Sequence, residues 1–116
     1  SRSMHADARK LLWDARQAAD RDARFTHGKT FDDYRADDLL RSGVERQLAI
    51  VGEALGQLRR IDPATAGSIP QLSRVVGFRN VLVRACASVD SRVVWGIVEA
   101  DLTPLRESLG VLIAQP

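Results

Sequence analysis

"DDLLRSGVERQLAIVGEALGQLRR", residues 37–60, forms the longest regular hydrophobic pattern of this chain. Its apolar residues recur at steps of four and three, the spacing of one continuous stripe along an α-helix. The stripe consists of Leu40, Val44, Leu48, Val51, Leu55 and Leu58. Glycine costs a helix interior about 1 kcal/mol relative to alanine. We therefore predict a long helix that neighbours approach closely at its glycines, Gly43, Gly52 and Gly56.

A second helical pattern precedes this stretch. It runs from Met4 to about Arg24, and the pair His27-Gly28 ends it. Thr30, with Asp33 three residues later, resembles a capping start and predicts a short turn that leads into the long helix.

Further helices are predicted on the C-terminal side. Residues 61–67 contain Pro63 and are expected to form a loop. Ser68 is then expected to cap a helix that runs toward Ala87, and Ser88 or Asp90 to cap the next one.

The last two helices have clear apolar stripes. In the first of them the predicted buried residues are Val93, Val94, Ile97 and Val98. Thr103-Pro104 is expected to stop that helix and start the last one, whose buried residues are Leu105, Leu109 and Leu112. No strand-like alternation occurs, so the predicted fold is an all-α antiparallel bundle of four to five helices.

Length and composition fit one domain. The chain has 116 residues, 45% of them hydrophobic, and we expect a single domain over residues 4–116, with residues 1–3 a remnant of cloning. Its apolar runs are too short to span a bilayer, and its only cysteine, Cys86, excludes an internal disulfide. We therefore expect a cytoplasmic protein. A net charge of +2 does not indicate a partner by itself.

A polar cluster lies in the segment "RNVLVRACASVD", residues 79–90. At about 100° per residue, Arg79, Asn80, Arg84 and Cys86 share one side of a helix. The predicted core face, on the opposite side, consists of Phe78, Val81, Leu82, Ala85 and Val89. The polar side contains no carboxylate, so its arginines either bind an anion, pair with an acidic residue of a neighbouring helix, or meet water.

Three segments resemble the HEPN superfamily, in particular the HepT-like toxins that are encoded beside minimal nucleotidyltransferase antitoxins. "VERQLAIVGEALGQL" at 44–58 is similar to the family's helix with an arginine followed by Gly-Glu-Ala. "IPQLSRVVGFRNVLV" at 69–83 is similar to its Ile-Pro and Gly-x-Arg-Asn segment. "SVDSRVVWGIVEADLTPL" at 88–105 follows its Val-Asp, Val-Trp and Leu-x-x-Leu ending. The resemblance covers nearly the whole chain from Met4.

The resemblance implies a helical homodimer in which both copies bring an Arg-(four residues)-His-x-Tyr motif to a shared cleft for metal-independent RNA cleavage. Arg79 and Asn80 match the first positions of that motif, so they are candidate catalytic residues together with Arg84. The sequence departs from the family at two positions, because Arg84 replaces the histidine and Cys86 replaces the tyrosine. A histidine gains and loses a proton near neutral pH, whereas arginine remains charged and can only bind or stabilise an anion.

Several interpretations stay open at this point. The chain is either a toxin that retains some ribonuclease activity, a dimer that binds RNA or a nucleotide without cutting, or an interaction subunit for a nucleotidyltransferase. Candidate binding residues are Arg79, Arg84, Cys86 and Glu53, and Glu53 is either a partner of Arg79 or a solvated residue. A relocated histidine and a reactive Cys86 thiol are less favoured. No metal or cofactor is expected.

Overall fold

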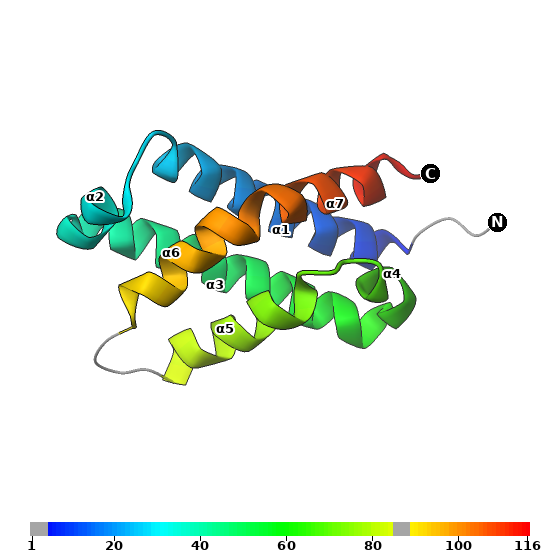
Figure 1. The fold of residues 1–116 in the computed structure, drawn as a ribbon. Coiled ribbons are helices and arrows are strands. Elements are labelled where there is room, and N and C mark those ends of the chain that lie inside the picture. The colour runs from blue at the N-terminus through cyan, green and yellow to red at the C-terminus, as the bar shows by residue number, and fades with distance from the viewer. Residues whose placement is uncertain (1–4, 85–88) are drawn as a thin grey trace.

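Helices make up all the regular structure of residues 5–84 and 89–116, the part of the chain that the computed structural model describes. The helices are α1 (Ala6–Thr26), α2 (Phe31–Ala36), α3 (Asp38–Ile61), α4 (Pro63–Gly67), α5 (Leu72–Arg84), α6 (Ser91–Ala100) and α7 (Leu102–Ala114). Figure 1 shows them as a bundle in which the long helices run roughly along one axis. The predicted all-α fold is confirmed.

The centre of the bundle is the antiparallel pair of α1 and α3 (Figure 1). On α1 the buried face is mostly alanine, and alanine side chains let two helix backbones approach closely. The buried residues of α3 include all of the predicted stripe except Leu40, which packs against the core and is half-buried. The stripe read from the sequence is therefore the core face of the longest helix.

The other helices pack around this pair. Helix α5 lies against α3, on the side away from α1, whereas α7 packs against α1. The two ends of the chain are joined, because the guanidinium of Arg9 donates hydrogen bonds to the backbone carbonyls of Ile113 at 2.8 Å and Gln115 at 2.7 Å. Because α1 and α5 both pack on α3, residues of these three helices can line a common groove.

Two of the predicted caps are present. Thr30 and Asp33 form a reciprocal capping box at the start of α2, so the expected short turn is a helix of six residues. The side chain of Asp90 accepts a hydrogen bond from the backbone N–H of Arg92 at 2.9 Å and caps α6. Ser88, the other candidate cap, lies outside the described residues.

The prediction for residues 61–68 is wrong. Instead of a loop, the chain forms α4, because Pro63 occupies the first helical position and Asp62 accepts hydrogen bonds from the backbone and hydroxyl of Thr65 at 3.2 and 2.6 Å. Ser68 does not cap α5 but ends α4, where its hydroxyl donates to the carbonyl of Thr65 at 2.6 Å. Helix α5 begins four residues later, at Leu72.

Two details of α6 and α7 also differ from the prediction. Val93 is exposed, and Trp95 is buried on that helix instead, with its ring centroid 5.3 Å from that of Tyr34. Helix α7 begins at Leu102, before the expected break, because Pro104 lies within its first turn, where the missing N–H has no helical partner to lose. Its predicted buried leucines are buried. Within the described ranges, no helix combines the length and apolar character needed to cross a lipid bilayer.

Candidate functional site

Arg79 lies on the side of α5 that faces α3. The atoms of its side chain nearest the backbone pack against Gly52, and only 33% of the side chain is exposed. The predicted core face of α5 is partly wrong, because Val81 is 54% exposed. Phe78 is buried as predicted, and Leu82 and Val89 pack against the core. Ala85 lies outside the described residues. The physical reason is that Gly52 has no side chain, so the aliphatic part of an arginine fills the space between the helices.

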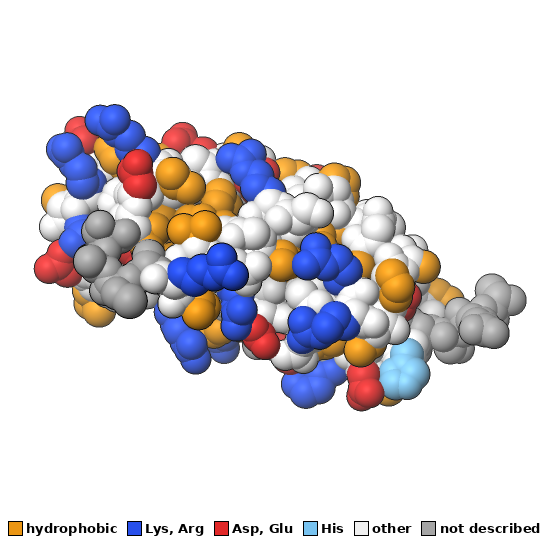
Figure 2. Space-filling view, turned by 90° about the horizontal axis from the view of Figure 1, so that it is seen from below, with side chains coloured by type: hydrophobic (Ala, Val, Ile, Leu, Met, Phe, Trp, Pro, Cys, Tyr) orange, Lys and Arg blue, Asp and Glu red, His pale blue; other side chains and the backbone are white. Residues whose placement is uncertain are grey.

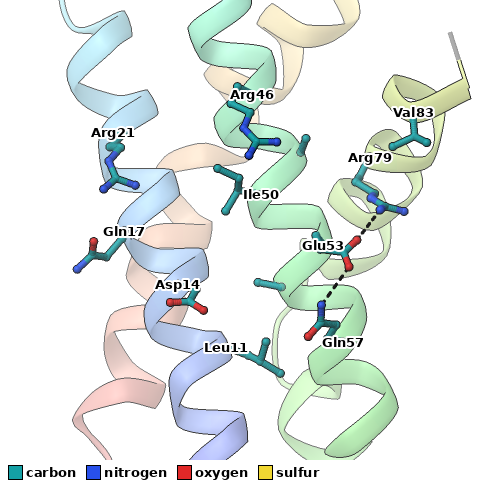
Figure 3. Close-up of a pocket in the computed structure, with 12 residues that line it drawn as sticks. Leu11, Asp14, Gln17, Arg21, Arg46, Ile50, Glu53, Gln57, Arg79 and Val83 are labelled. Carbon is teal, nitrogen blue, oxygen red and sulfur yellow. Dashed lines mark hydrogen bonds and ion pairs between the residues drawn. The ribbon is translucent and has the colours of Figure 1, made fainter. Parts of the chain in front are cut away.

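The guanidinium of Arg79 is paired with a carboxylate of the neighbouring helix. Its Nη2 atom lies 2.5 Å from Oε2 of Glu53, and the Oε1 atom of Glu53 accepts a hydrogen bond from the Gln57 amide at 3.0 Å (Figure 3). These two partners, Gln57 first and the charge of Arg79 second, lower the pKa of Glu53 below its usual value. Of the two interpretations of Glu53, partner of Arg79 is confirmed.

The remaining predicted residues are arranged differently. The side-chain oxygen of Asn80 accepts a hydrogen bond from Arg79 at 3.3 Å, and Asn80 is exposed. Arg84 is the last residue of α5 and is also exposed. Cys86 lies outside the described residues. The structure thus brings together Arg79, Asn80 and Glu53.

A groove of about 580 Å³ runs between α1, α3 and α5 beside this ion pair. We call it the α1–α3–α5 groove. Its apolar lining residues are Leu11, Ala49, Ile50, Ala54 and Val83. Its charged lining residues are Asp14, Arg21, Arg46, Glu53 and Arg79. Figure 3 shows one of the arginines on each of the three helices.

The charges of the groove do not cancel locally. Asp14 pairs with Lys10 at 3.0 Å, and Glu53 pairs with Arg79. Arg21 and Arg46 have no hydrogen-bond or ion-pair partner among the residues that the structure describes. Two guanidinium groups therefore remain available at the groove, above apolar side chains, which suits an anionic ligand with a flat or apolar part.

Sequence reasoning missed Arg21 and Arg46, although a signal for them exists. Five of the ten basic residues of α1 to α3 have an acidic residue three or four positions away on the same helix, as Lys10 has Asp14. Neither Arg21 nor Arg46 has one. Arg9, Arg59 and Arg60 share this feature, so the signal is weak, and it is their place in the groove that distinguishes Arg21 and Arg46.

The face shown in Figure 2 has Lys and Arg side chains along its length, with hydrophobic side chains between them.

The two histidines lie at opposite ends of α1, where His5 caps its beginning and His27 its end, and neither lines the groove. A relocated catalytic histidine therefore has no support within one copy of the chain. The described residues contain no group of three side chains suited to hold a metal ion.

Comparisons with known proteins find one family and two relatives with similar sequences. A family model described as "Ribonuclease HepT-like" matches residues 15–112. "Putative RNase MJ1380" of Methanocaldococcus jannaschii is 24% identical over 106 residues, which are 91% of this chain and 96% of the relative. "Gamma-glutamylcyclotransferase and putative RNase MJ0434" of the same organism is 29% identical over 85 residues, which are 73% of this chain but only 38% of that protein. No solved structure matches.

Proposed function

Because this chain belongs to the family of HepT-like ribonucleases, in the HEPN superfamily, we propose that it binds single-stranded RNA in the α1–α3–α5 groove and has lost the ability to cut it. One observation supports binding above all others. Arg21 and Arg46 line the groove without a partner among the described residues, next to the ion-paired Arg79. Guanidinium groups in this state are suited to phosphate oxygens, which accept two hydrogen bonds from one arginine.

The loss of cleavage follows from the residue at position 84. Cleavage of RNA through its own 2′-hydroxyl requires a group that accepts and donates a proton near neutral pH. Arg84 stands where the family has that group, and an arginine keeps its proton at any physiological pH. Arg84 and Arg79 are then binding residues that neutralise phosphate charge, with Asn80 as a further hydrogen-bonding group.

We place the protein in a toxin–antitoxin module, as a homodimer with a minimal nucleotidyltransferase as its partner. The family resemblance implies that such a partner modifies the motif tyrosine, but here position 86 is a cysteine. Tyr34, the only tyrosine of the chain, is completely buried. The folded chain therefore offers no accessible tyrosine for modification. The partner would have to inhibit this protein by forming a complex with it.

RNA affinity measured against salt tests the binding proposal. We expect labelled single-stranded RNA to bind at low salt and to be released as salt rises, because bound phosphates release counterions. The double variant Arg21→Ala with Arg46→Ala should weaken binding about 10-fold to 100-fold. It should also flatten the salt dependence by about 0.7 for each phosphate that the variant no longer neutralises. Arg92→Ala is the matched control, since Arg92 is exposed on α6 outside the groove.

Equal affinity of the double variant and the native protein would reject the groove as the binding site. Cleavage is tested separately, by incubating the purified protein with unstructured RNA at several pH values. We expect no cleavage above a buffer control. Cleavage by the native protein would favour the alternative, a toxin that is still an active ribonuclease, and would assign a catalytic part to Arg84.

A further inference from the structure

Trp13, on the outer side of α1, is unusually exposed for a tryptophan. Its relative exposure is 52%, whereas the other tryptophan, Trp95, is buried at 7%. The indole is the largest apolar side chain, and a single exposed apolar residue needs no explanation by itself. Here the indole is not isolated, because it forms one wall of a separate hollow of about 250 Å³.

The Trp13 hollow is otherwise lined by the side chains of Arg16, Gln17, Asp20, Arg21 and Arg24. Its single described carboxylate is already engaged, since Oδ1 of Asp20 accepts from Nε of Arg16 at 3.0 Å and from Nε of Arg106 at 2.7 Å. Arg21 and Arg24 have no partner within the described residues. The hollow thus combines a flat aromatic wall with positive charge that no carboxylate compensates.

This hollow lies next to the α1–α3–α5 groove. Gln17 and Arg21 line both of them. Along a helix axis, Trp13 and Arg21 are separated by about 12 Å, because each residue rises about 1.5 Å. One extended RNA strand that passes over Arg21 would contact the groove on one side of this residue and the indole of Trp13 on the other.

We propose that the Trp13 hollow is a subsite for one unstacked base of a single-stranded RNA. The base lies against the indole of Trp13, while Arg21 and Arg24 bind the phosphates that flank it. Stacking of bases on aromatic side chains, with arginines along the backbone, is a general way of binding single-stranded nucleic acid without a strict sequence. The inference rests on the proposed function, because it extends the path of RNA beyond the groove.

The experiment compares RNA with an oligonucleotide of equal length that has sugar and phosphate but no bases. For the native protein the complete RNA should bind about 5-fold to 100-fold more tightly, because only it can stack on Trp13. In Trp13→Ala this difference should disappear, whereas Trp13→Phe should keep most of it. Leu39→Ala is the matched control, because Leu39 is also a largely exposed apolar side chain but lines neither hollow nor groove.

Tryptophan fluorescence gives a second measurement, in which Trp13→Phe shows how much of the emission comes from Trp95. RNA should quench the emission of the exposed Trp13 and leave the buried Trp95 unchanged, and the oligonucleotide without bases should quench little. The inference is overturned if Trp13→Ala keeps the native affinity for both oligonucleotides and RNA does not quench the emission of Trp13. The proposal that the groove binds RNA would not be affected by that result. If instead the native protein binds neither at low salt, the proposed function itself fails. If Trp13→Ala changes only the assembly of the protein, the hollow is a protein contact and the inference is wrong.

Discussion

Gly52 of α3 lies directly against the Cβ atom of Arg79 on α5. A methyl group at position 52 would overlap that atom and would lie 2.9 Å from Cγ of Arg79 and 3.1 Å from the backbone oxygen of Val75. None of these atoms is the free end of a flexible side chain, so α3 and α5 would have to separate. The same contact places the guanidinium next to Glu53. One glycine therefore sets both the spacing of the helices and the position of the arginine.

Replacing Gly52 by alanine should lower the free energy of unfolding by about 1–3 kcal/mol, the usual cost of overpacking. It should also weaken RNA binding, because Arg79 moves away from the groove. Denaturant unfolding measures the first effect. The matched control is Gly77→Ala on α5, where an added methyl group meets no atom within 4 Å. This control should stabilise the protein by about 0.5–1 kcal/mol, since alanine favours a helix interior. Similar unfolding midpoints for the two variants would contradict the packing described for Gly52.

Periodicity was sufficient to predict the core of α3 and the close approach at Gly52, because that helix is covered by neighbours on a wide face. It was not sufficient for α5. A helix at the edge of the bundle buries only a narrow face, and the apolar residue Val81 remains exposed while Arg79 is half-buried. A prediction from hydrophobicity alone therefore assigns the wrong side of such a helix to the core.

The site was predicted in part for a related reason. Arg79, Asn80 and Glu53 lie in short sequence motifs, which is why the sequence identifies them, and the structure brings them together. The groove depends in addition on Arg21 and Arg46, which come from different helices. Their proximity is a consequence of how α1 and α3 pack, and the spacing of residues within one helix carries no information about it.

Asp22 makes stability depend on pH. It lies fully buried on the core face of α1, and neither carboxyl oxygen has a hydrogen-bond partner among the described residues. Burial raises the pKa of Asp22 from 3.8 to about 8. The folded protein thus holds a proton that the unfolded chain releases above about pH 4. The stabilisation from this proton is complete below pH 3.8 and is lost progressively as the pH rises toward 8.

We therefore expect Asp22→Asn to melt at a higher temperature than the native protein near pH 8, and the difference to shrink toward pH 5. Thermal unfolding at several pH values measures it. Asp38→Asn is a suitable control, because the side chain of Asp38 is 93% exposed. A difference in melting temperature that does not change with pH would contradict a buried, protonated Asp22.

The hydroxyl group of Tyr34 should contribute nothing favourable to stability. It is buried without a hydrogen-bond partner among the described residues, whereas the ring packs against Trp95. Tyr34→Phe should therefore leave the free energy of unfolding unchanged or raise it by about 1 kcal/mol, since an unsatisfied buried hydroxyl is costly. Tyr34→Ala should lower it by about 3–5 kcal/mol, because the ring leaves a cavity. Denaturant unfolding compares the two, and a clear loss of stability in Tyr34→Phe would reveal a hydrogen bond to the hydroxyl.

Restoring a titratable group at position 84 should restore cleavage if the rest of the scaffold is intact. A histidine at this position changes its charge near pH 6.5, so it can move the proton of the RNA 2′-hydroxyl as Arg84 cannot. We expect Arg84→His with Cys86→Tyr to cut unstructured RNA at least about 10²-fold faster than the native protein, the usual gain from one acid–base residue. The rate should vary with pH around the pKa of that histidine.

Arg84→Lys is the control, because its side chain stays charged at neutral pH and should give no cleavage. Adding Arg79→Ala to the restored variant should abolish the new activity, since Arg79 would no longer hold the phosphate. If the restored variant binds RNA but does not cut it at any pH, the missing proton-transfer group is not what limits this protein, and the geometry around Arg79 and Asn80 must differ from that of an active ribonuclease.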